Sequence, residues 1–144
     1  MVDTSVLIEI ILEGSPYMKT LEELFREAER GAKELYITPL IVSELLYVAY
    51  KIYKSAGMED PKKDAEDFVN WVLFRAELAK VGLETAIIAG KIKEELGLSL
   101  ADCYVLATFK QLEAKPLFLK PGGEMREKME QLEKMGIILL DGRS

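Results

Sequence analysis

The chain has 144 residues, 49% of them hydrophobic, which is enough apolar material for the core of one domain but includes no run long enough for a transmembrane helix. Its formal net charge of −6 argues against a uniformly basic surface, although it is compatible with a local basic groove. The sequence has no histidine and a single cysteine, Cys103, so an internal disulfide, the common zinc sites and histidine-activated nucleophiles are excluded, and carboxylates are the leading catalytic candidates.

The first segments along the chain are predicted to be a short strand leading into a helix over Val2 to Leu12 and an amphipathic helix over Tyr17 to Ala32. Asp3 and Glu9 interrupt the first apolar stretch, and no basic leader precedes it, which argues against a secretory signal. We therefore expect a cytoplasmic protein. A compact strand is predicted next, over Leu35 to Ile37.

The rest of the chain alternates between helices and short strands. Thr38 and Pro39 are typical of an N-cap and a first helical position, so a helix is predicted from there to about Tyr53. Further helices are predicted over Asp64 to Ala79, Glu84 to Leu96, Ser99 to Leu112 and after Gly123 to Met135, and strands over Pro116 to Leu119 and Ile137 to Leu140. This order predicts one domain over residues 1–144 of the α/β class, with a mostly parallel sheet of four to five short strands in a three-layer α/β/α arrangement.

Asp3 directly follows the first predicted strand. In open α/β sheets, ligands bind at the carboxyl ends of the strands, so the position of Asp3 is that of a functional residue. The other interpretation is that Asp3 only caps the helix that follows, which is a common use of aspartate. Asp3 by itself does not decide between the two.

Glu44 lies within an apolar stretch of its predicted helix. Apolar residues occupy the neighbouring positions on its own side of the helix, which we expect to face the core: Leu40, Ile41, Leu45 and Val48. An ionised carboxylate placed there costs several kcal/mol unless it is paired or bound to a metal. The alternatives are that Glu44 turns toward solvent or pairs with a lysine.

Asp102 repeats this pattern in the nearly apolar helix that Ser99 begins. Ser99 and Asp102 also have the spacing of a capping box, so the aspartate could close the first helical turn, and capping and metal binding could coexist. If Asp3, Glu44 and Asp102 converge at the carboxyl edge of the sheet, their mutual repulsion calls for a cation. Mg²⁺ or Mn²⁺ is the cation that oxygen ligands favour.

Three segments together make the chain resemble the PIN domains, and within them the VapC-like toxin ribonucleases. They are VDTSVLIEI at Val2 to Ile10, ITPLIVSELLYVA at Ile37 to Ala49 and LGLSLADCYVLAT at Leu96 to Thr108, followed by the strand predicted at Pro116 to Leu119. The resemblance implies that Asp3, Glu44 and Asp102 are acidic metal ligands and catalytic residues. It also implies that Ser5 is a possible hydroxyl helper beside them.

The fourth acid of that family, usually found in a Thr-x-Asp turn after the third strand, is missing from this sequence. Glu124 could replace it as a metal ligand, or could be an ordinary first-turn glutamate favoured by the helix dipole. This departure leaves open a second interpretation, in which the chain is a catalytically weak or inactive PIN-like module that binds RNA or a protein. A haloacid dehalogenase-type phosphohydrolase is disfavoured because Ser5 stands where its second aspartate is expected.

The resemblance also implies an activity and partners. The activity is hydrolysis of RNA phosphodiester bonds by one or two Mg²⁺ or Mn²⁺ ions, in the toxin component of a VapBC-type toxin-antitoxin system. The implied partners are RNA, a VapB-like antitoxin on the hydrophobic helices around Leu40 to Tyr53 and Phe68 to Ala79, and a second copy of the chain in a homodimer or higher homo-oligomer. Four lysines could steer RNA toward the site: Lys91, Lys93, Lys110 and Lys120.

Overall fold

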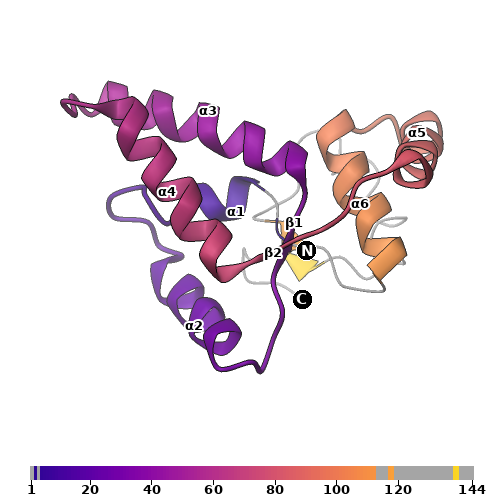
Figure 1. The fold of residues 1–144 in the computed structure, drawn as a ribbon, viewed down its shortest axis with the longest axis horizontal. Helices are drawn as coiled ribbons and strands as arrows, with labels where there is room; N and C mark the ends of the chain where they lie inside the picture. The colour runs from indigo at the N-terminus through magenta and orange to yellow at the C-terminus, as the bar shows by residue number, and fades with distance from the viewer. Residues whose placement is uncertain (1, 3, 113–116, 119–137, 140–144) are drawn as a thin grey trace.

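Helices account for most of the chain in the computed structural model, which describes residues 2, 4–112, 117–118 and 138–139 (Figure 1). The helices are α1 (Thr4–Ile8), α2 (Met18–Glu29), α3 (Pro39–Ser55), α4 (Pro61–Arg75), α5 (Leu83–Leu96) and α6 (Leu100–Leu112). The strands are β1 (Tyr36–Ile37), β2 (Glu77–Leu78), β3 (Leu117–Phe118) and β4 (Ile138–Leu139). None of the described helices has both the length and the apolar character needed to cross a membrane.

The helix boundaries follow from local capping. The hydroxyl of Thr38 accepts a hydrogen bond of 3.1 Å from the backbone N–H of Ile41, and Pro39 occupies the first turn of α3, as predicted. Asp60 caps α4 in the same way through the backbone N–H of Lys63, at 3.2 Å. α5 ends at Gly97, whose φ of 67° is a left-handed conformation that glycine adopts at little cost.

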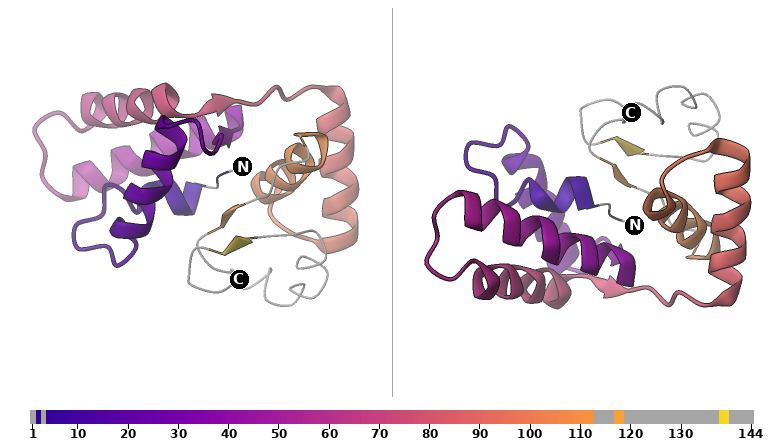
Figure 2. Two further views of the ribbon diagram at one scale, coloured as in Figure 1. Left: turned by 90° about the horizontal axis from the view of Figure 1, so that it is seen from below. Right: turned by 90° about the horizontal axis from the view of Figure 1, so that it is seen from above.

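The strands pair in parallel. Tyr36 of β1 is in register with Glu77 of β2, and Leu117 of β3 is in register with Ile138 of β4. The backbone N–H of Val2 donates to the carbonyl of Tyr36 at 2.9 Å, which adds the N-terminal segment beside β1. The strand pairs lie between the helices α1 to α4 on one side and α5 and α6 on the other (Figures 1 and 2). The predicted α/β class and parallel pairing are therefore confirmed.

One predicted element is wrong at its C-terminal end. The helix predicted over Asp64 to Ala79 ends at Arg75, because Ala76 has an extended backbone with φ −127° and ψ 150°. Glu77 and Leu78 then form β2, and the backbone N–H groups of Glu77 and Ala79 donate to the carbonyls of Leu35 and Ile37, respectively. A neighbouring strand thus supplies hydrogen bonds that compete with continuation of the helix.

The buried apolar side chains form one hydrophobic cluster, to which all of the helices α1 to α6 contribute. Residues of α3 are at its centre: Ile41, Leu45 and Ala49 are fully buried. Phe25 of α2 and Trp71 of α4 join two helices at its edge, with ring centroids 5.1 Å apart. The charged helix predicted after Gly123 lies outside the described residues.

Candidate functional site

Thr4 and Glu44 bring the start of α1 to the start of α3. The hydroxyl of Thr4 donates a hydrogen bond of 2.8 Å to Oε1 of Glu44, between residues that are 40 positions apart in the sequence. α1 is held there because Val6, Leu7 and Ile8 are buried in the core, which packs this short helix against α3. Thr4 directly follows Asp3, so the segment that carries Asp3 is attached to the helix that carries Glu44.

Glu44 turns toward solvent, which is one of the orientations that the sequence left open, and not toward the core. The side chain is exposed, whereas its neighbours Ile41 and Leu45 are fully buried. A helix turns by about 100° per residue, so Glu44 lies at the boundary of the apolar face rather than on it. The carboxylate therefore avoids the cost of burial and remains accessible to solvent, to a cation or to a substrate.

Asp102 lies in the first turn of α6 and is half-buried. Its backbone N–H donates to the hydroxyl of Ser99 at 3.2 Å, so Ser99 acts as the N-terminal cap of the helix. This hydrogen bond is made by the backbone N–H of Asp102 and not by its carboxylate. The predicted start of a helix at Ser99 agrees with this geometry.

The turn between α5 and α6 positions the start of α6, where Asp102 lies. The ammonium group of Lys93 donates to the carbonyl oxygen of Leu98 at 2.8 Å, and the thiol of Cys103 lies 3.7 Å from the same oxygen. Leu98 itself is fully buried, which anchors the turn in the core. Lys93, which the sequence suggested only as a residue that steers RNA, therefore has a structural contact in this turn.

The three helices that carry these residues are in contact, since α3 touches both α1 and α6. Asp3 and Glu124 lie outside the described residues, and Ser5 is a half-buried residue of α1. Among the residues that are described, no three acidic or cysteine side chains come together as a metal site. The described oxygen groups of Thr4, Glu44 and Asp102 are of the kind that suit Mg²⁺ or Mn²⁺.

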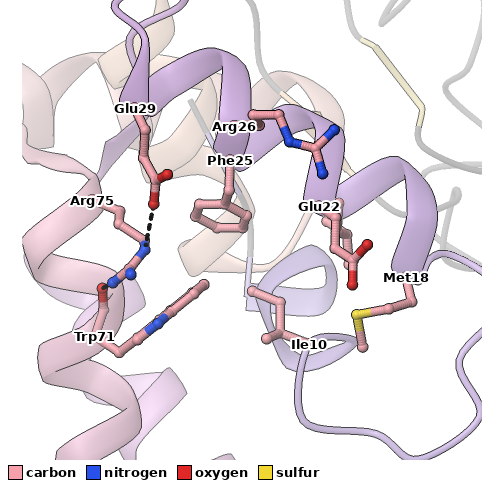
Figure 3. Close-up of a pocket in the computed structure, with 9 residues that line it drawn as sticks. Ile10, Met18, Glu22, Phe25, Arg26, Glu29, Trp71 and Arg75 are labelled. Atoms are coloured by element: carbon pink, nitrogen blue, oxygen red, sulfur yellow. Dashed lines mark hydrogen bonds and ion pairs between the residues drawn. The ribbon is translucent and has the colours of Figure 1, made fainter.

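A separate cavity of about 350 Å³ lies between α2 and α4, next to the turn after α1 (Figure 3). Its lining combines apolar and charged side chains: Ile10, Met18, Leu21, Glu22, Phe25, Arg26, Glu29, Trp71 and Arg75. Glu22, Glu29 and Arg26 are seen on the α2 side of this hollow, and Trp71 and Arg75 on the α4 side. A mixed apolar and charged lining suits a peptide better than a purely apolar ligand.

Arg75 holds one side of this cavity in place. Its Nε donates to Oε1 of Glu29 at 3.0 Å and its Nη1 donates to the carbonyl of Trp71 at 3.1 Å. The guanidinium carbon also lies 4.0 Å from the centre of the Trp71 ring, which is a cation–π contact. These contacts join α2 to α4 and fix the arginine next to the opening.

Comparison with known proteins gives a consistent result for the fold. The family model of the PIN domain matches residues 1–118. Among solved structures, the chain is similar to the VapBC2 complex of Rickettsia felis bound to a DNA fragment from its promoter, with a TM-score of 0.66 and 16% identity over 96% of this chain and 95% of that one. It is also similar to VapBC-1 from nontypeable Haemophilus influenzae, with a TM-score of 0.63 and 14% identity over 98% and 97% of the two chains. A comparison with curated proteins gives no match.

Proposed function

Because the chain belongs to the PIN domain family, we propose that it is a Mg²⁺- or Mn²⁺-dependent endoribonuclease of the VapC type, acting as one domain. PIN domains are in general nucleases that require a divalent metal. The observation that carries this proposal for the present chain is the hydrogen bond from Thr4 to Glu44. This hydrogen bond links the residue that follows Asp3 to a solvent-accessible carboxylate on α3. α3 also contacts α6, and Asp102 lies in the first turn of α6.

The acidic residues share one role in this proposal, and two hydroxyl residues position them. Asp3, Glu44 and Asp102 hold the metal through carboxylate oxygens, with Glu124 as a further ligand that takes the place of the missing family acid. Thr4 fixes the rotamer of Glu44, and Ser99 fixes the start of α6. A divalent ion bound there would activate water and stabilise charge on the leaving oxygen during phosphodiester hydrolysis.

The first test measures metal binding and cleavage separately. Mn²⁺ is titrated into the wild-type protein by calorimetry, and a mixed RNA pool is then incubated with the protein at increasing Mn²⁺ or Mg²⁺. We expect saturable binding and metal-dependent cleavage in the wild type, and loss of both in Asp3→Asn and Asp102→Asn. The matched control is Asp67→Asn, which makes the same change in charge at an exposed residue of α4.

An inactive PIN-like module is the second candidate, favoured by the absence of the usual fourth acid. It predicts tight binding of RNA or a protein partner with no cleavage at any concentration of Mn²⁺ or Mg²⁺. Wild-type protein that fails to cleave RNA under conditions where it remains folded would support this candidate and contradict the nuclease. Glu124→Gln adds a second distinction, since cleavage should fall if Glu124 is a ligand and remain unchanged if it is not.

We further propose a VapB-like antitoxin as a protein partner, because the two similar structures named above are VapBC proteins. The cavity between α2 and α4 is the surface we assign to it, since the partly buried Trp71 offers apolar area and Arg75 offers a fixed cation. A co-expressed antitoxin should be retained by the wild type and lost from Trp71→Glu. Its retention by that variant, with folding verified by circular dichroism, would contradict this assignment.

Self-association is proposed through a different surface. Phe74 at the end of α4 and Leu83 at the start of α5 are 89% and 79% exposed, which is unusual for large apolar residues close together in sequence. Burial of both in a homodimer would remove this apolar area from water. Light scattering on the Phe74→Ser variant should then give the mass of a monomer.

We also propose that the protein acts on RNA in the cytoplasm.

A further inference from the structure

The exposed side of α3 carries tyrosines and lysines in repeated pairs. The ammonium of Lys51 lies 5.2 Å from the ring centre of Tyr47, and that of Lys54 lies 5.8 Å from the ring centre of Tyr50. Each pair is separated by one helical turn, so the two pairs are neighbours on one face. Tyr47 is 61% exposed even with Lys51 beside it, which leaves much of its ring open to solvent.

This face is continuous with Glu44. Val48, Lys51 and Ser55 follow Glu44 at about one, two and three helical turns, so they lie in one row along α3. The same row borders an open groove of about 510 Å³, whose lining consists of Val48, Lys51, Ile52, Ser55 and Ala56. The opposite side of α3 is buried against the core. α3 runs along the upper edge of the molecule in Figure 1, above α1 and α4.

The charge on α3 differs in sign from that of the whole chain. The helix has two lysines and one glutamate, which gives a net charge of +1, whereas the chain has −6. From the neighbouring helix α4, Asp64 acts electrostatically on Tyr53. Tyr53 is two positions from Lys51 and therefore on another side of α3. Lys51 of this row and the nearby Lys54 thus lie next to the exposed ring of Tyr47 and the half-buried ring of Tyr50.

We propose that this face of α3, defined by Tyr47, Tyr50, Lys51 and Lys54, binds the single-stranded part of the RNA substrate next to the scissile phosphate. The inference rests on the proposed ribonuclease function. Lysine ammonium groups bind backbone phosphates, and exposed tyrosine rings stack on bases of any identity, a combination that is common in proteins that bind single strands. The apolar floor at Val48 and Ile52 suits contact with the faces of sugars and bases.

The experiment measures binding of a fluorescent single-stranded RNA by anisotropy, with the full-length protein in EDTA so that metal-dependent cleavage does not contribute. The variants are Tyr47→Ala and the double substitution Lys51→Gln with Lys54→Gln. Lys19→Gln is the control, because it removes one charge from an exposed lysine of α2. Circular dichroism verifies that each variant is folded, and light scattering records its oligomeric state.

We expect Tyr47→Ala to bind RNA at least about fivefold more weakly, as is typical for the loss of one stacked base. The double lysine variant should also lower the slope of log affinity against log salt by about 1.4, since each phosphate contact to a single strand contributes about 0.7. Lys19→Gln should leave the slope unchanged within error. The wild type should cleave RNA when Mn²⁺ replaces EDTA.

Three results would overturn this inference. They are unchanged RNA affinity in all α3 variants, absence of measurable RNA binding by the wild type at low salt, and a changed oligomeric state in the variants without a change in RNA affinity. The last result would identify the face as a contact between copies of the chain. If the wild type binds RNA through α3 but does not cleave it with Mn²⁺, the nuclease proposal fails while the RNA-binding face stands.

Discussion

The hydroxyl of Thr4 and the Oε1 atom of Glu44 are 2.8 Å apart and hydrogen-bonded, which ties the first turn of α1 to the second turn of α3. This contact orients a carboxylate that is otherwise on an exposed helix surface, where a free glutamate samples several rotamers. A ligand whose rotamer is already fixed loses less entropy when it binds a metal. Thr4 is therefore a positioning residue for Glu44 in the proposed site.

Thr4→Val should weaken Mn²⁺ binding by about tenfold, because groups that orient a metal ligand typically contribute 10- to 100-fold in affinity. The free energy of unfolding should fall by about 1 kcal/mol at most, since the hydrogen bond is exposed. Thr4→Ser retains the hydroxyl and should behave as the wild type. Calorimetric titration measures the first effect and urea denaturation the second. Equal Mn²⁺ affinity in Thr4→Val and the wild type would rule out this role.

Substitutions at Ser99 and Asp102 should distinguish helix capping from metal binding. Ser99→Ala removes the acceptor of the Asp102 backbone N–H and should lower the free energy of unfolding by about 1 kcal/mol. Asp102→Asn retains that backbone hydrogen bond but removes the carboxylate charge, so it should abolish Mn²⁺ binding while the cap of α6 remains. Urea denaturation and calorimetry are compared for both variants. Full Mn²⁺ affinity in Asp102→Asn would mean that the aspartate serves only the first turn of α6.

Leu45 and Leu46 are a matched pair of sites for testing how α3 packs against the core. Leu45 is fully buried and Leu46 is 39% exposed, although they are adjacent in the same helix. Leu45→Ala should lower the free energy of unfolding by about 2–5 kcal/mol through lost burial and a residual cavity. Leu46→Ala should cost less than about 1 kcal/mol. Similar midpoints of urea denaturation for the two variants would contradict the packing of α3.

Tyr53 should make stability depend on pH in the alkaline range. Burial raises the pKa of its phenol above the usual value of 10.0, and the negative charge of Asp64 raises it further. The folded protein therefore retains the phenol proton in a range where the unfolded chain has lost it. The stabilisation from this phenol is complete below its pKa in the unfolded chain. It is lost as the pH rises through its pKa in the folded protein.

The corresponding test compares the wild type with Tyr53→Phe. The free energy of unfolding of the wild type should fall as the pH rises above about 10, and that of Tyr53→Phe should fall less steeply. Between about pH 6 and 8 the difference between the two proteins should be constant, because the phenol is protonated in both states. Parallel profiles at alkaline pH would show that Asp64 and burial do not act on this group.

Several features of the fold were predictable from short stretches of sequence. Thr38 with Pro39 marks the start of α3, Gly97 marks the end of α5, and Ser99 marks the start of α6. These signals are local because a cap or a left-handed turn depends on the side chains of only a few adjacent residues. The α/β class followed from the order of such elements and the family resemblance from three sequence segments, and the family match confirms both.

Tertiary contacts decided the rest. The apolar pattern after Asp64 continues to Ala79, yet the helix stops at Arg75 because Leu35 and Ile37 offer hydrogen bonds to the next residues. In the same way, apolar neighbours in sequence suggested that Glu44 faces the core, whereas the packing of α3 rotates it to the boundary, within reach of Thr4. Sequence determines local conformation and the types of side chain available. Which of them meet depends on partners distant in the chain, because hydrogen bonds and burial between distant residues become known only once the chain is packed.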